Sequence, residues 1–242
     1  MTSIARWSEF SGRLSETAVR IVGEAEISTD PDHKPQLLSA LLLARTIANH
    51  RGVVELVQRH LVVEARILAR CCFENMFWIA GLVRDRDAFV NLMLDDEMKS
   101  RQSRGKALFA DKVTRTALDS DAEAKLRGWL TDAGKRFPDA RYLTPKAVAF
   151  GTSVASAYHL YSQLSSDAAH PSIEALDRHA PGPEATIDIA PVAKTAELED
   201  TLNLAANAFL GACVGANEML KTPAGENLSL LADEYNALDR NS

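Results

Sequence analysis

Several familiar chemical signatures are missing from this sequence of 242 residues. It contains three cysteines, Cys71, Cys72 and Cys213, and none of them forms a CxxC pair. The six histidines show no HExxH or ExxH spacing, which excludes the usual zinc and di-iron ligand patterns. Neither GxGxxG nor GxxxxGK[ST] occurs, so the common phosphate-binding loops are absent as well. We therefore predict no metal site and no bound cofactor.

A long apolar run and a strong excess of one charge are also lacking. The 27 basic and 33 acidic residues give a net charge of −6, which argues against an overall electrostatic design for nucleic acid. The longest uncharged stretch, residues 147–166, is rich in Ser, Thr and Tyr and is a poor membrane span. The N-terminus does not resemble a secretory signal, and the few cysteines suit reduced thiols. We expect a cytoplasmic protein without a membrane partner.

Helical periodicity dominates what is present. Apolar residues recur at steps of three and four over about residues 2–26, 53–85, 87–112 and 194–220. Pro35 and Pro145 are placed as first-turn prolines, and we expect the second of these helices to run to about His170. Gly52 follows His50-Arg51 and is interpreted as the end of the helix that starts near residue 35.

The least helical segment is residues 171–193, which contains the turn Pro181-Gly182-Pro183. We predict that it leaves the helical body as a loop-rich excursion or a short β-hairpin. The fold class predicted for the chain is all-α, a bundle of about seven to eight helices. We expect one domain over residues 1–242, with a core of about 35–220, because no linker or repeat divides the chain.

Three charged residues run through an otherwise apolar helix. Arg66, Arg70 and Glu74 lie four residues apart, so they share one helical face. Buried charges are costly unless they are paired, and the spacing of Arg70 and Glu74 allows an ion pair. This row therefore indicates either a structural ion-pair network or part of a polar functional site.

A second polar pattern lies in the sequence YHLYSQLSSDAAHPS. Tyr158, Ser162, Ser165 and Ser166 fall on one face of the predicted helix, and His170 follows where Pro171 ends it. A helix C-terminus favours a cation, which would raise the proton affinity of this histidine. A hydrogen-bond cluster is the structural alternative for hydroxyls at this spacing. A Ser–His nucleophile lacks the strained turn that usually exposes a catalytic serine.

Two further patterns leave RNA as an alternative partner. The spacing Arg45-x-x-x-x-His50 is similar to the motif of the helical HEPN ribonucleases, although Thr46 replaces the usual polar residue. Residues 99–115 contain six basic residues and one acidic residue. Such a run is typical of a solvated helix face, and an RNA contact is the alternative.

Two of these segments, taken in order, resemble a known family. ARCCFE, residues 69–74, and YHLYSQLSSDAAH, residues 158–170, resemble the signatures of a bacterial all-helical family known as domain of unknown function 5677. The resemblance covers roughly residues 35–220. It implies a helical bundle in which Arg70, Glu74, Tyr158, Ser166 and His170 converge, and it implies no particular reaction.

These patterns lead to one functional hypothesis and two alternatives. A pocket that joins both polar faces suits an anionic or nucleotide-like ligand, held by Arg66, Arg70, Tyr158, Ser162 and Ser166. Glu74 and His170 are the candidates for proton transfer in catalysis. The first alternative is a HEPN-like ribonuclease toxin or phage-defence effector. The second is a non-catalytic interaction protein in which the charged row is a structural ion-pair network. The amphipathic terminal helices suit a homodimer.

Overall fold

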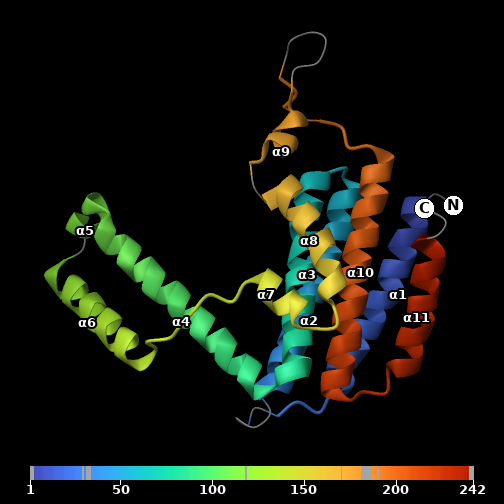
Figure 1. The fold of residues 1–242 in the computed structure, drawn as a ribbon. Coiled ribbons are helices and arrows are strands. Elements are labelled where there is room, and N and C mark those ends of the chain that lie inside the picture. The colour runs from blue at the N-terminus through green and yellow to red at the C-terminus, as the bar shows by residue number, and fades with distance from the viewer. Residues whose placement is uncertain are drawn as a thin grey trace. The chain divides into compact units, whose positions relative to one another are not determined.

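The fold is taken from a computed structural model, which describes residues 3–28, 30, 34–117, 119–169, 171–180, 187–189 and 191–239. The regular secondary structure of these residues consists of helices, and none of them lies in a strand (Figure 1). The prediction of an all-α fold is therefore confirmed. No helix in these ranges is long and apolar enough to cross a membrane.

Contacts divide the helices into two compact units. The first unit consists of Met1–Arg84 and Pro145–Ser242, and the second consists of Asp85–Thr144. The prediction of a single domain over the whole chain stays a prediction. The two units are described separately below.

The body of the first unit is built from five long helices. These are α1 (Ser3–Glu24), α2 (Lys34–Gln58), α3 (Val62–Asp85), α10 (Thr195–Leu220) and α11 (Gly225–Asp239). The central helix α10 packs against α1, α2 and α11 (Figure 1). Trp7, Phe10, Leu43, Phe77 and Phe209 are fully buried and form much of the core. Burial of such side chains is the main source of stability in a bundle of this kind.

Glycine 52 was expected to end a helix, but the structure shows that this prediction is wrong. The helix α2 continues through Gly52 to Gln58. A Cβ atom on Gly52 would lie 2.5 Å from Cδ1 of Leu68, so the glycine allows α2 and α3 to approach closely. The chain turns instead at His60, whose φ of 58° is left-handed.

A layer of short helices, which we call the short-helix layer, covers one side of this body. It consists of α7 (Pro145–Phe150), η2 (Ala155–Ala157), α8 (Tyr158–Leu164), the π-helical turn η3 (Ser165–Ala169) and α9 (Ile173–Asp177). One helix from Pro145 to His170 was predicted, and the break after Phe150 contradicts it. Arg84 donates a hydrogen bond to the carbonyl oxygen of Gly151. A Cβ atom at Gly151 would meet that guanidinium group, so a larger residue here would displace the end of the Arg84 side chain.

The excursion near residues 171–193 is described in part, and the predicted turn Pro181-Gly182-Pro183 lies outside the described residues. Its helical part is α9, and the described residues 187–189 and 191–193 contain no strand. Ser172 caps α9, because its hydroxyl accepts a hydrogen bond from the amide of Ala175 at 3.0 Å. His179 Nδ1 lies 2.7 Å from the carbonyl oxygen of Asp188 and ties the later part of the excursion to the end of α9.

The second unit is a hairpin of two long helices. It contains α4 (Asp87–Ala110), α5 (Lys112–Ala117) and α6 (Ser120–Arg136). The Asp119 carboxylate caps α6 by accepting a hydrogen bond from the amide of Ala122 at 2.7 Å. A Cβ atom on Gly105 would lie 2.9 Å from Cδ2 of Leu130, which shows how closely α4 and α6 approach.

Candidate functional site

Arg70 connects α3 to the short-helix layer. Its Nε donates to the hydroxyl of Ser165 at 2.8 Å, and its Nη2 donates to the hydroxyl of Tyr161 at 2.7 Å. The same Nη2 lies 2.8 Å from Oε1 of Glu74, the i,i+4 partner predicted from the sequence. Tyr161 in turn donates its hydroxyl hydrogen to Glu74 Oε1 at 3.0 Å. These four residues form the Arg70 cluster, which fixes α8 and η3 against α3.

The Arg70 cluster is partly open to solvent. The side chains of Arg70 and Glu74 are 23% and 28% exposed. Burial and then the charge of Glu74 raise the pKa of the Tyr161 hydroxyl, so it remains a hydrogen-bond donor. The guanidinium carbon of Arg70 also lies 5.0 Å from the centroid of the Tyr161 ring. The cluster is therefore held by charge-assisted hydrogen bonds from two nitrogens of the guanidinium group and by a cation–π contact with Tyr161.

Arg66, one turn earlier in α3, belongs to a different set of contacts. Its Nη1 bonds to the carboxylate of Asp167 in η3. Its Nη2 lies 3.2 Å from Oδ2 of Asp200, and its Nε donates to the hydroxyl of Thr201 at 3.1 Å. Both of the latter residues belong to α10, so Arg66 links three elements of the first unit.

Arg178, directly after α9, completes this ion-pair network. Its Nη2 lies 3.0 Å from Oδ1 of Asp167, and its Nη1 lies 2.8 Å from Oε1 of Glu197. Asp167 therefore accepts from two arginines that belong to different elements. We call Arg66, Asp167, Arg178, Glu197 and Asp200 the Asp167 network. It holds η3 and α9 against α3 and α10.

The pKa values show that the carboxylates at the centre of this network stay charged. Burial alone would raise the pKa of Asp167, but the bonds and charges of Arg66 and Arg178 outweigh it and lower the pKa. Glu197 follows the same pattern, with burial outweighed by its backbone bond to Lys194 and by Arg178. Asp200 is different, because burial raises its pKa despite the nearby Arg66.

A groove with a volume of about 1020 Å³ lies beside the Asp167 network. Its polar and charged lining consists of Arg66, Tyr158, His159, Ser162, Gln163, Ser166, Asp167, Asp177, Arg178, Asp188, Lys194, Glu197 and Asp200. Three hydroxyl-bearing residues of α8 and η3, Tyr158, Ser162 and Ser166, thus share a groove with the first arginine of the charged row.

The predicted site residues fall into two groups. Arg66, Tyr158, Ser162 and Ser166 line the groove, whereas Arg70 and Glu74 do not. The side chains that contact Arg70 are Tyr161 and Ser165, which share a different face of the same helical segment. His170 lies outside the described residues, directly after Ala169 in the chain.

Tyr161 was not among the predicted site residues, and Ser165 was assigned to the face of Tyr158, Ser162 and Ser166, although one signal separates the two faces. Leu164 is buried, and it lies three residues after Tyr161 on the inward face of α8. An apolar marker of this kind distinguishes the inward face from the outward face, which the polar spacing alone does not. Asp167, Arg178 and Asp200 had no such signal, because their contacts join residues far apart in the chain.

The Arg45 and His50 pair does not form a common surface. His50 is 0% exposed, and its ring lies 4.6 Å from that of Phe209. Its Nε2 lies 3.4 Å from the hydroxyl of Ser11, and burial lowers its pKa to about 4. Arg45, by contrast, is exposed. The two side chains of this motif are therefore separated by the packing of α2.

The cysteines are free thiols rather than reactive thiolates. Cys72 and Cys213 are fully buried, and burial raises the pKa of both. Burial and the charge of Glu74 also raise the pKa of Cys71. Within the described parts of the chain, no group of three or more His, Cys, Asp or Glu side chains is placed to hold a metal ion.

A family model described as a family of unknown function, DUF5677, matches residues 36–183. The match covers more than half of the chain, and the chain belongs to this family. It includes both segments that carried the resemblance, so the family prediction is confirmed. Searches of curated proteins and of solved structures give no significant match.

Proposed function

We propose that this member of the DUF5677 family binds a nucleotide-like ligand with at most one phosphate in the groove beside the Asp167 network. The observation that carries the proposal is the lining, which combines an aromatic ring, hydroxyls and carboxylates around about 1020 Å³. Small-molecule sites typically have volumes of about 300–1,000 Å³. The groove is therefore large enough for a mononucleotide.

Tyr158 is the candidate platform for a base. It is the groove-lining member of a row of aromatic contacts, with ring centroids 5.4 Å from Phe150 and 5.7 Å from Tyr161. Tyr161 in turn contacts the buried ring of Phe77 at 5.7 Å. Stacking of a base on an aromatic side chain contributes about 1–3 kcal/mol in single-stranded complexes. A ring supported by its neighbours in this way favours a planar ligand.

The other side chains suit a sugar. The exposed hydroxyls of Ser162 and Ser166 can both donate and accept hydrogen bonds. The carboxylates of Asp177 and Asp200 can only accept them, and carboxylates are the usual partners of ribose hydroxyls. This combination matches a polyhydroxylated ligand better than a purely apolar one.

The charge of the groove lining favours an anionic ligand with a small negative charge over a highly charged one. Five carboxylates face the groove with three cations, Arg66, Arg178 and Lys194. The two arginines already hold carboxylates. Lys194 has no carboxylate partner among the described side chains. One free cation can accept one phosphate, whereas the surrounding carboxylates would repel a triphosphate.

In this proposal Arg70 and Glu74 do not touch the ligand. They hold in place α8 and η3, which carry the ligand-binding residues. They hold Tyr161 and Ser165, and these residues belong to the helical segment that carries Tyr158, Ser162 and Ser166. Proton transfer by Glu74 and His170 stays a prediction, and ligand binding does not require it.

The two alternatives are less well supported by the geometry. A ribonuclease that used Arg45 and His50 would need both side chains at one accessible surface, and His50 is fully buried. A purely structural ion-pair network accounts for the contacts of Arg66 and Arg178. It does not account for a groove lined by hydroxyls and an aromatic ring.

Titration calorimetry and thermal unfolding with adenosine, adenosine monophosphate, uridine monophosphate and adenosine triphosphate test the proposal. We expect a nucleoside or a monophosphate to bind and to raise the melting temperature, because a ligand that binds only the folded state stabilises it. The triphosphate should bind more weakly. Tyr158→Ala should abolish binding, whereas Tyr158→Phe should retain it.

Matched serine substitutions provide the control. Ser162→Ala should weaken binding, and Ser229→Ala should not, because Ser229 is exposed on α11 away from the groove lining. The proposal is wrong if none of the four ligands binds, or if Tyr158→Ala binds as tightly as the natural sequence.

A further inference from the structure

The excursion carries an unusual concentration of exposed apolar side chains. Ile189 is 90% exposed, Val192 86% and Ile173 79%, and Ile187 and Leu176 are also mostly exposed. Ile173, Leu176 and Asp177 lie on one face of α9, within about 100° around the helix axis. The contact between His179 and the Asp188 carbonyl brings Ile187 and Ile189 to the end of α9.

We call these residues the excursion patch: Ile173, Leu176, Asp177, Ile187, Asp188, Ile189 and Val192. Its two acidic side chains are exposed. The patch is therefore apolar with an acidic rim. Exposed apolar surface of this kind marks a contact with another molecule more often than scattered single residues do.

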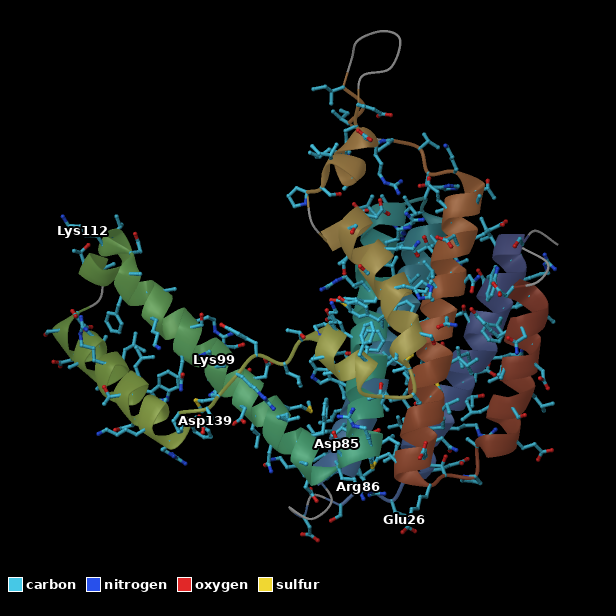
Figure 2. All side chains as sticks on the ribbon, in the orientation of Figure 1. Glu26, Asp85, Arg86, Lys99, Lys112 and Asp139 are labelled. Carbon is cyan, nitrogen blue, oxygen red and sulfur yellow. The ribbon has the colours of Figure 1, made fainter. Side chains whose placement is uncertain are left out.

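The second unit carries a strip with the opposite charge. Leu94, Arg101 and Leu108 follow one another at steps of seven along α4, and Arg104 lies between the last two. All four side chains are exposed, and steps of three, four and seven place them on one helical face. Lys112 and the 77% exposed Val113 continue the apolar and basic character into α5. Figure 2 shows these helices with Lys99 and Lys112 labelled.

We call Leu94, Arg101, Arg104, Leu108, Lys112 and Val113 the α4 strip. Glu97 pairs with Arg101 at 2.5 Å and lies 3.9 Å from Arg104, so this carboxylate faces two cations, and Lys112 adds a third cation to the strip. The strip therefore keeps a positive charge beside its apolar residues. Its basic and apolar side chains are complementary to the acidic and apolar side chains of the excursion patch.

We propose that the protein forms a homodimer in which the excursion patch of one copy docks on the α4 strip of the other. Apolar side chains would fill the centre of the contact, with acidic residues from one copy facing basic residues from the other. Every copy carries both surfaces, so two copies can offer this contact twice. The apolar faces of α1 and α11, which the sequence suggested as a dimer surface, are already packed within the first unit.

A charge-swap experiment on the full chain tests this proposal by analytical ultracentrifugation. The first variant carries Asp177→Lys and Asp188→Lys, and the second carries Arg104→Glu and Lys112→Glu. Each variant alone would oppose like charges at both contacts, so self-association should weaken by about tenfold or more. A mixture of the two variants restores opposite charges at both contacts and should form heterodimers.

Control substitutions separate this contact from a general effect of charge. Glu226→Lys with Asp233→Lys changes two exposed acids on α11 and should leave the dimer intact. Ile189→Ser should weaken the dimer without changing its charge. The proposal is overturned if the natural protein is monomeric at every concentration, if the two variants associate as strongly as the natural protein, or if mixing them restores nothing.

Discussion

His50 and Arg66 are both polar residues inside the first unit, and their side chains have opposite surroundings: His50 has no charged partner among the described residues, whereas Arg66 has two carboxylate partners. His50 is fully buried with one hydroxyl 3.4 Å away, and burial keeps it neutral. Arg66 is 13% exposed, and Asp167, Asp200 and Thr201 surround its guanidinium group. Burial without an opposite charge favours the neutral form of an imidazole, whereas a guanidinium cannot give up its proton and is buried only together with anionic or polar partners.

This difference separates the two sequence patterns that suggested a functional site. The Arg45 and His50 spacing resembled a catalytic motif, but its histidine is part of the core. The charged row had no catalytic spacing, yet its first arginine lies at the groove. Spacing along a helix does not show which face meets solvent, and the neighbouring helices determine that.

The largest expected effect comes from breaking the Asp167 network. Asp167→Asn removes the negative charge shared by Arg66 and Arg178 and replaces one acceptor oxygen by an NH2 donor, although each arginine keeps a second carboxylate. We expect a loss of about 3 kcal/mol in the free energy of unfolding, the lower end of the range for broken buried pairs. Denaturant unfolding measures this loss, and hydrogen exchange should show α9 opening first.

Asp177→Asn is the matched control, because Asp177 is an exposed aspartate at the end of α9, the helix that the Asp167 network holds in place. It should change the unfolding free energy by no more than about 0.5 kcal/mol. Equal effects of the two substitutions would contradict the assignment of Asp167 as the centre of the network.

The next effect is a pH dependence that comes from His50. Its pKa falls from an ordinary 6.5 to about 4 on folding, so the unfolded chain binds the proton first as the pH falls. The stability that neutral His50 contributes is present above pH 6.5 and is lost as the pH falls toward 4. The loss between pH 6.5 and 4.5 should be about 2 kcal/mol, and His50→Leu should remove this slope.

The Asp167 network should respond in a lower pH window. The pKa values of Asp167 and Glu197 are lowered from ordinary values of 3.8 and 4.5, so their contribution is present above those values and is lost below them. Asp167→Asn should therefore change the pH profile only below about pH 4.5. An unchanged slope between pH 6.5 and 4.5 in His50→Leu would contradict this division.

A smaller effect is expected at Arg70. Arg70→Ala removes the bonds to Ser165 and Tyr161 and the pair with Glu74, and we expect a loss of about 1.5 kcal/mol. Arg70→Lys should lose less, because an ammonium can still pair with Glu74 but cannot hold both hydroxyls in the same geometry. Thermal unfolding of the two variants measures the difference. Equal stabilities of Arg70→Lys and Arg70→Ala would show that only the fork geometry matters.

The sequence predicted the long helices well. Their apolar periodicity locates α1 and α10 within a few residues, because each buries a continuous face. The sequence did not predict the roles of two glycines. Gly52 permits a close helix contact instead of ending α2, and Gly151 accepts a bond from Arg84 where a helix was expected to continue. A glycine's role depends on what packs against it, which local sequence does not contain.

The site was predictable in part for a similar reason. The i,i+4 pair of Arg70 and Glu74 is local, and its spacing predicted it correctly. The partners of Arg66 are Asp167 and Asp200, which lie about a hundred residues or more along the chain. No periodic pattern links such residues, because the turns at η3 and α9 bring them together.

The groove beside the Asp167 network is proposed to bind a mononucleotide, and a crystal structure of the full chain grown with adenosine monophosphate tests this binding. We predict density for the ligand in this groove, with the base against the Tyr158 ring and the phosphate within reach of Lys194. An empty groove at saturating ligand, or a nucleotide bound elsewhere on the molecule, would contradict the claim.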